Sequence, residues 1–344
     1  MKRLSKSARL FCSTLLVLCA STNADAISAD QLAVVFNTAD ADSRELAGYY
    51  QQQRRIPPQN MIAVEMPPGM SQLNREQFAI IYSQVIQATP AEVQYYALAW
   101  SQPYRVACMS VTSAFAFGFD EKYCGRGCVA TAPSAYFNSE SNAPYADFKI
   151  RPSMLLAGSS LEQARAMIDR GVRSDHRQSQ GPRATAYLLS TSDKARNVRA
   201  RIYPDVVAQL GHRLPIEIVH SDVLENKPDV MFYFTGMISV NDIETNTFVE
   251  GAIADHLTST GGNLFGGQQM SILRWLDAGA TASYGSVVEP CAFVQKFPNP
   301  GIVIERYTRG ESLIEAYWKS VQWPGQGVFV GEPLATPYTV AKRL

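Results

Sequence analysis

The stretch that decides the fold is Val230-Met-Phe-Tyr-Phe-Thr-Gly236, a short apolar run that predicts a buried strand ending at Thr235-Gly236. A segment rich in glycine, hydroxyl and acidic side chains follows, Gly251-Ala-Ile-Ala-Asp-His-Leu-Thr-Ser-Thr-Gly-Gly262. Reactive groups in α/β proteins gather where parallel strands end, because the sheet opens there into a crevice. We therefore expect the functional site to lie at the end of this strand.

Strand and helix patterns alternate through the rest of the chain. Apolar runs predict strands at 32–36, 61–66, 95–100, 186–189, 216–219 and 281–287. One amphipathic helix is marked by apolar residues at helical spacing, namely Phe78, Ile81, Tyr82, Val85 and Ile86. This alternation implies right-handed crossovers and a parallel sheet. The predicted fold class is α/β, with a largely parallel, Rossmann-like sheet flanked by helices.

Two features suggest how the chain is divided. The stretch from Ser101 to Pro152 is rich in aromatic, Ser, Asn and Pro residues, and a loop region of this length is often a binding surface or a lid. The charged run 169–177 is interpreted as a solvated connector. We therefore expect an N-terminal α/β subdomain at 27–175, carrying the long aromatic loop, and a C-terminal α/β subdomain at 176–344, carrying the candidate site.

The first 26 residues are typical of a cleaved export signal. Four basic residues precede the apolar run 10–20, and Ala24-Asp25-Ala26 supplies small residues at the cut. The apolar run is too short to span a bilayer, which needs about 20 residues, so no stable membrane insertion is expected after signal removal. The remaining chain has 27 basic and 30 acidic groups and no basic stripe, so no nucleic-acid partner is expected. The predicted location is secreted or periplasmic.

Four cysteines follow the signal segment: Cys108, Cys124, Cys128 and Cys291. An even number in an oxidising compartment favours two disulfides. The short Gly-containing stretch between Cys124 and Cys128 is flexible enough for these two to pair, which would leave Cys108 with Cys291, although spacing does not fix connectivity. A four-cysteine zinc site and a nucleophilic Cys291 are the alternatives.

Several segments together resemble an uncharacterised secreted bacterial family that co-occurs with the exosortase protein-sorting system. They are Tyr49-Tyr50, Arg54-Arg-Ile-Pro-Pro58, Asn60, Ile150-Arg-Pro-Ser153, Gly251 to Gly262, Gly279-Ala-Thr-Ala-Ser-Tyr-Gly285, Val288-Glu-Pro-Cys291, Lys296-Phe-Pro298 and Gly331-Glu-Pro-Leu334. The resemblance runs across nearly the whole chain after the signal segment. It implies a role at the bacterial envelope and assigns no reaction.

A second, more distant resemblance is to gingipain-type and caspase-like cysteine peptidases, in which one strand ends in His-Gly and the next in a nucleophilic Cys. Phe234-Thr235-Gly236 takes the His-Gly place, 277–281 the Gly-Ala-rich segment that follows, and Gly331-Glu-Pro333 a late Gly-Asp-Pro. Thr235 stands where the base would be, and residues 257–261 contain no Cys. The resemblance therefore implies a caspase-like sheet that lacks the Cys/His dyad.

Asp255 and His256 are the first candidates for catalysis. A carboxylate that holds an imidazole makes a general base, and Ser259 or Thr260 would be the activated hydroxyl. If the segment is helical, however, the spacing of Ala252, His256 and Thr260 makes His256 a core histidine. Both interpretations stay open at this stage.

Glu289 follows the strand predicted at 281–287, so we expect its carboxylate at the same sheet edge as Asp255, where the pair would serve acid/base chemistry or hold a hard cation. A strand-end hydrogen-bond acceptor is the alternative for Glu289. The expected catalytic set is Asp255, His256, Ser259 and Glu289. The residues expected to contribute to binding are Thr235, Thr258, Thr260 and Tyr284.

No cofactor and no metal are expected. Asp40 and Asp42 lack the glycine and distal glutamate of a calcium loop, and Asp42 suits a helix cap. The glycine pairs at 261–262 and 266–267 are not followed by a phosphate-loop lysine, and no Gly-x-Ser-x-Gly elbow occurs. The sequence thus favours an envelope-associated protein that is either a non-cysteine hydrolase or a peptidase-fold relative that keeps its crevice for binding. The alternative is a non-catalytic module whose loop, Ser101 to Tyr145, recognises a peptide or glycan at the cell surface.

Overall fold

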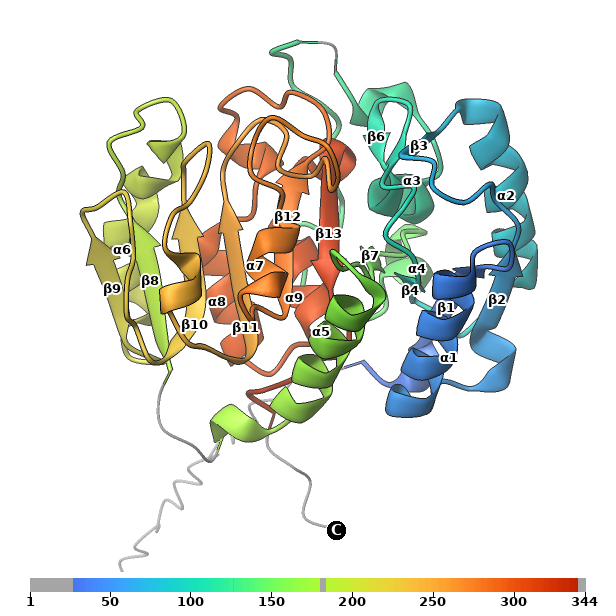
Figure 1. Cartoon of the computed structure of the whole chain (residues 1–344), viewed down its shortest axis with the longest axis horizontal. Coiled ribbons are helices and arrows are strands. Elements are labelled where there is room, and N and C mark those ends of the chain that lie inside the picture. Colours follow the sequence, from blue (N-terminus) through green and yellow to red (C-terminus); the bar gives the residue numbers. More distant parts are fainter. Residues whose placement is uncertain (1–26, 126, 180–183, 340–344) are drawn as a thin grey trace, which may run out of the picture.

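The predicted alternation of strands and helices is confirmed by the computed structural model, which describes residues 27–125, 127–179 and 184–339 (Figure 1). Ten strands form one sheet in the order β2-β1-β4-β7-β13-β12-β11-β10-β8-β9. The strands are β1 Leu32–Asn37, β2 Met61–Val64, β4 Tyr95–Leu98, β7 Ser153–Leu155, β8 Thr185–Leu189, β9 Ile216–Val219, β10 Val230–Thr235, β11 Phe248–His256, β12 Ala282–Ser286 and β13 Gly327–Gly331. A three-stranded sheet is formed by β3 Gln72–Leu73, β5 Arg105–Val106 and β6 Met109–Ser110.

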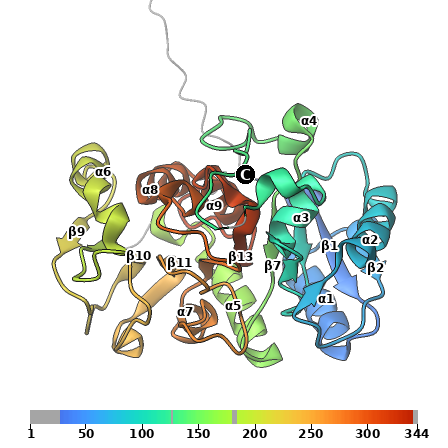
Figure 2. The same cartoon turned by 90° about the horizontal axis from the view of Figure 1, so that it is seen from above.

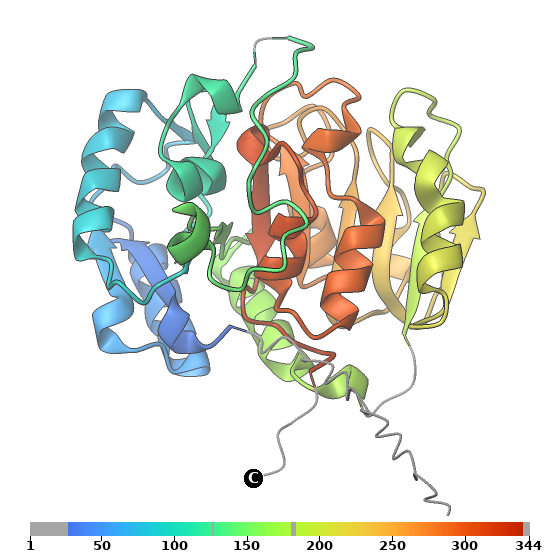
Figure 3. The same ribbon diagram turned by 180° about the vertical axis from the view of Figure 1, so that it is seen from behind.

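Helices cover both faces of the large sheet, as Figures 2 and 3 show. The helices are α1 Ala41–Arg54, α2 Arg75–Ala88, α3 Val111–Phe117, α4 Pro144–Phe148, α5 Leu161–Ser174, α6 Tyr203–Leu210, α7 Leu273–Asp277, α8 Pro300–Thr308 and α9 Leu313–Lys319. One face carries α1, α5 and α7, and the other carries α3, α6, α8 and α9. The fold is therefore α/β with a largely parallel sheet flanked by helices, as the sequence predicts.

The strands fall into two groups that follow one another along the chain. β2, β1, β4 and β7 pair in parallel, and so do β12, β11, β10, β8 and β9. β13 lies between the groups: it pairs antiparallel with β12 over 327–331 and meets β7 at Val330 and Leu155. The inner strands of each group bury near-continuous apolar runs on both faces, which is typical of covered parallel strands, whereas the edge strands β2 and β9 are partly exposed.

Parts of the chain differ from the sequence-based expectation. The stretch Ser101 to Pro152, predicted to be irregular, contains β5, β6, α3 and α4. The charged run expected to be a connector is helical as far as Ser174, because it completes the last turns of α5. The segment that begins at Gly251 is not helical: 251–256 belongs to β11, whose residues are almost all buried.

The two disulfides are not the pairs that loop flexibility suggested. Cys108 is bonded to Cys124 and Cys128 to Cys291, with Cα atoms 5.7 and 5.4 Å apart. The second bond spans 163 residues, and only the folded sheet brings such distant positions together. Two disulfides are a feature of proteins from oxidising compartments. The predicted signal segment, 1–26, lies outside the described residues, in which no helix has the length and apolar content needed to cross a bilayer.

The residue after β13 ties the two strand groups to each other. Glu332 is completely buried, and its carboxylate accepts a hydrogen bond from the Tyr50 hydroxyl at 2.6 Å and is paired with the guanidinium of Arg54. Arg54 also pairs with Asp175, which follows α5. α1, α5 and β13 therefore meet in one buried ionic cluster.

Replacing Glu332 with Ala should lower the free energy of unfolding by about 3–5 kcal/mol, because the buried Arg54 guanidinium loses its main partner. Urea unfolding followed by circular dichroism measures the change. Glu250→Ala is the matched control: Glu250 pairs with the half-exposed Arg173, so that change should cost no more than about 1 kcal/mol. Equal losses in the two variants would contradict the assigned importance of the buried cluster.

Candidate functional site

The candidate residues Thr235, Asp255 and His256 stand at the ends of two paired strands. The register of β10 and β11 sets Phe234 beside Asp255 and Thr235 beside His256. Because successive side chains of a strand point to opposite faces, Asp255 and His256 face different helix layers. All three residues are almost completely buried.

His256 is held by hydrogen bonds on the α7 face. Trp275 Nε1 donates to His256 Nδ1 at 3.0 Å, so the ring proton is on Nε2, which donates to the Met270 carbonyl at 3.1 Å. The side chain is 1% exposed, and burial lowers its pKa to about 3. The imidazole is thus a neutral core side chain, and both of its nitrogens are occupied by structural partners.

Asp255 forms a buried ion pair on the opposite face. Its Oδ1 lies 2.6 Å from Arg199 Nη2, and its Oδ2 accepts from the Tyr317 hydroxyl at 3.3 Å. Burial raises the pKa of Asp255, and the adjacent guanidinium offsets part of that rise. Arg199 also donates to the carbonyls of Thr235, at 2.7 Å, and Pro298, at 3.3 Å. Sequence analysis did not identify Arg199, although it fastens both strand ends to the loop at 298.

Three other predicted residues do come together, beyond the strand ends. Thr258, Ser259 and Glu289 line one cavity of about 130 Å³, here called the edge cavity, together with Arg196 and Cys291. Arg196 Nε donates to the Thr258 hydroxyl at 3.3 Å. Glu289 accepts a hydrogen bond from the backbone N–H of Cys291 at 2.7 Å. This is the strand-end acceptor role that was the alternative for Glu289.

The remaining predicted binding residues have structural contacts. Thr258 donates to the side-chain oxygen of Gln269 at 2.8 Å, and the backbone N–H of Thr260 donates to the same oxygen at 2.8 Å. Tyr284 is buried in β12 and donates to the Lys296 carbonyl at 2.6 Å. The hydrogen bonds of Asp255 and His256 lead to Arg199, Tyr317, Trp275 and Met270, so the expected chain from base to Ser259 is not formed.

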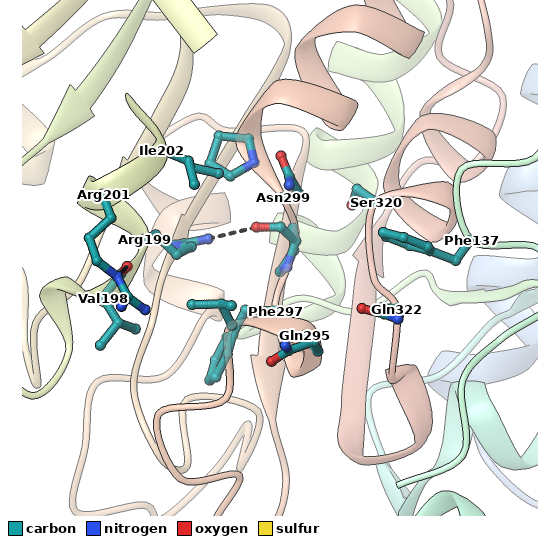
Figure 4. A pocket seen from close by; sticks show the side chains of 13 residues that line it. Phe137, Val198, Arg199, Arg201, Ile202, Gln295, Phe297, Asn299, Ser320 and Gln322 are labelled. Atoms are coloured by element: carbon teal, nitrogen blue, oxygen red, sulfur yellow. Dashed lines mark hydrogen bonds between the residues drawn. The ribbon is translucent and has the colours of Figure 1, made fainter. Parts of the chain in front are cut away.

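A second cavity, here called the apolar pocket, lies beside α8 and α9 and has a volume of about 250 Å³ (Figure 4). Its side chains come from four stretches of the chain: Phe137, Val198, Arg199, Arg201, Ile202, Val294, Gln295, Phe297, Pro298, Asn299, Pro300, Ser320 and Gln322. Phe137 belongs to the long aromatic loop. Both cavities are bounded by the same two segments, 195–202 and 289–300.

Lys296 is a further residue that sequence analysis did not single out as chemical. It lies in a short 3₁₀ helix, Val294–Lys296, and is 2% exposed. Its buried Nζ has no hydrogen-bond partner in the described part of the chain. Burial lowers its pKa, and the negative charge of Glu289 partly opposes this. Across residues 27–125, 127–179 and 184–339, no group of three or more His, Cys, Asp or Glu side chains is arranged to hold a metal ion.

Comparison with known proteins gives one structural likeness. No protein-family model matches the chain, and no curated protein matches it in sequence. A solved structure described as "Structure of Protease" superposes with a TM-score of 0.48 at 10% identity, over 90% of this chain and 79% of that one. No residue role is carried over from that structure.

The free energy of unfolding should decrease as the pH is lowered below 7, because His256 is buried in its neutral form. The pKa of the imidazole is lowered from 6.5 to about 3 on folding, so the unfolded chain binds a proton first, and stability that is complete above pH 6.5 is lost as the pH falls toward 3. Between pH 7 and pH 5 the loss should be about 2 kcal/mol. Urea titrations at both pH values should show this loss in the wild type and a smaller one in His256→Gln. Equal losses would show that His256 is not the group responsible.

Replacing Lys296 with Met should leave the stability unchanged or raise it by up to about 2 kcal/mol, because the change removes a buried cation without a hydrogen-bond partner. Lys319→Met is the matched control. Lys319 is 1% exposed and its ammonium lies 2.8 Å from the Glu311 carboxylate, so its loss should cost about 3–5 kcal/mol. Thermal and urea unfolding compare the two variants. A large loss in Lys296→Met would mean that the ammonium has a stabilising partner.

Proposed function

We propose that this protein binds a peptide between the segments 195–202 and 289–300, with an apolar side chain of the peptide in the apolar pocket. The observation that carries the proposal is the lining of that pocket. Phe137, Ile202 and Phe297 converge on it from three separate stretches of the chain. Ligand sites are usually concave and mainly apolar, with a few polar groups that fix orientation.

The polar groups at the apolar pocket suit a peptide backbone. Gln295, Asn299 and Gln322 carry amides that donate and accept hydrogen bonds, as a peptide bond requires. Asn299 already accepts from the N–H groups of Gly301 and Ile302 at the start of α8, which fixes its orientation. A bound main chain would thus meet at least one amide, that of Asn299, that is held in place before binding.

The edge cavity extends the same surface toward the strand ends. Arg196 and Glu289 bring opposite charges to its lining, and Arg196 is fixed by Asp193, whose carboxylate lies 2.9 Å from its guanidinium. In the proposal these two side chains contact polar parts of the peptide next to the apolar anchor. Asp255 and His256 act as supports, because their bonds hold β10, β11 and the loop at 298 in position.

The proposal places the protein at the bacterial envelope, exported by the signal segment at 1–26, with the disulfides formed there. In this proposal the crevice at the sheet edge serves recognition and not catalysis. Hydrolysis is the competing function, because Ser259 and Glu289 line the same cavity.

Peptide binding can be tested with a displayed library of random heptapeptides, followed by fluorescence titration of the selected sequences. Selected peptides should share a Leu, Ile or Phe, and Phe137→Ala should weaken binding at least tenfold, because it removes one wall of the apolar pocket. Val198→Trp, which fills the pocket, should abolish binding. Phe265→Ala, which changes a partly exposed aromatic side chain outside the pocket, is the control and should bind normally.

Two outcomes would contradict the proposal. One is a library that yields no sequence bound better by the wild type than by Val198→Trp. The other is cleavage of the bound peptides that Ser259→Ala abolishes, which would make hydrolysis the function instead.

A further inference from the structure

A third cavity, here called the switch-point cavity, opens in the other strand group, where β1, β4 and β7 end. Its volume is about 270 Å³. β1 is paired with β2 on one side and β4 on the other, so the chain changes direction across the sheet at this point. In open α/β sheets such a topological switch point is where ligands bind.

The negative charge of the switch-point cavity excludes a nucleotide phosphate, which is the usual ligand at a topological switch point. Nucleotide-binding sheets place a glycine-rich turn and a helix N-terminus there to hold phosphate. Here Asp40 caps the N-terminus of α1 and Asp42 lies in the first turn of that helix, and the cavity lining contains no lysine or arginine. Two carboxylates without a basic neighbour repel an anion, so the ligand must offer hydrogen-bond donors.

Some polar groups of the cavity form hydrogen bonds with other described residues, and others form none. Asp40 Oδ1 accepts from the N–H of Asp42 at 3.0 Å, and the Ser101 hydroxyl donates to the Gly158 carbonyl at 3.1 Å. These bonds hold the loops after β1, β4 and β7 in place. Within the described part of the chain, no hydrogen bond engages the carboxylate of Asp42 or the amide of Gln102, although both residues line the cavity. They are available to a ligand.

An exposed aromatic ring completes the cavity. Phe265 comes from the loop after β11, in the other strand group, and lines the cavity while remaining 38% exposed. Few large hydrophobic side chains in the described residues are as exposed as this one. A flat apolar ring beside free acceptors and an amide provides a surface for a ligand with one apolar face and several hydroxyl groups.

We propose that the switch-point cavity binds a saccharide. Sugar hydroxyls donate to the carboxylates of Asp40 and Asp42 and exchange hydrogen bonds with the Gln102 amide, while the C–H face of the sugar ring packs on Phe265. The two carboxylates lie at the N-terminus of the 14-residue helix α1, whose dipole partly compensates their charge. That compensation favours neutral hydroxyl donors over a fully charged organic cation.

The experiment is a titration of the full chain with a panel of oligosaccharides containing glucose, galactose, mannose or N-acetylglucosamine, followed by saturation-transfer NMR and calorimetry. At least one member should bind, and Phe265→Ala and Asp42→Asn should each weaken it at least tenfold. Asp205→Asn, on the exposed face of α6, and Phe137→Ala, in the apolar pocket, are the controls and should bind the saccharide as the wild type does.

The proposal is overturned if no saccharide in the panel binds, or if Phe265→Ala and Asp42→Asn bind it as tightly as the controls. It is also overturned if arginine amide or cadaverine binds in place of the saccharides and salt abolishes that binding, since the site would then recognise a cation. Because Phe137 serves as a control here, failure of this proposal and failure of the peptide proposal are distinguishable.

Discussion

The pairing of β13 with strands from both groups is the constraint on which the rest of the structure depends. β13 is the last strand in the described part of the chain, yet it occupies the centre of the sheet, between β7 and β12. Neither group has its inner edge covered until residues 327–331 are in place, and Glu332 then closes the ionic cluster with Arg54 and Tyr50. Contacts between residues so far apart in sequence slow folding, because the entropy of loop closure must be overcome before they form. The two strand groups thus come from separate stretches of the sequence, and β13 joins them.

Burial determines which of the titratable side chains remain available for catalysis or ligand binding. Asp255 and His256 are the residues that most suggest catalysis, but each is enclosed by partners that use its hydrogen-bonding groups for structure. The side chains that line the cavities are less conspicuous in sequence: amides, partly exposed phenylalanines, and an arginine held by Asp193 and Thr258. The molecule therefore presents shaped surfaces with fixed polar groups, which is the arrangement that recognition requires.

The local pattern of apolar residues was enough to predict most of the fold from the sequence. Apolar runs and helical spacing located β1, β4, β8, β10 and α2, because each of these elements buries a continuous face. The same reasoning failed for β11, since glycine at 251 and the polar residues at 255 and 256 hide a strand that is buried on both faces. Of the four expected catalytic residues only Ser259 and Glu289 line one cavity, and Arg199, Lys296 and the apolar pocket were not predicted. Their significance arises from burial and from contacts between distant segments, which periodicity does not encode.

The bond between Cys128 and Cys291 connects the long aromatic loop to the wall of the edge cavity. Cys291 lines that cavity, and Phe137, nine residues beyond Cys128, lines the apolar pocket. This covalent link therefore fastens the loop that carries Phe137 to the segment 289–300, which bounds both cavities. In a reducing environment the sheet would keep its hydrogen bonds, but this rim would lose its tether. An oxidising compartment keeps this tether intact, so the aromatic loop and the edge cavity hold their relative position there.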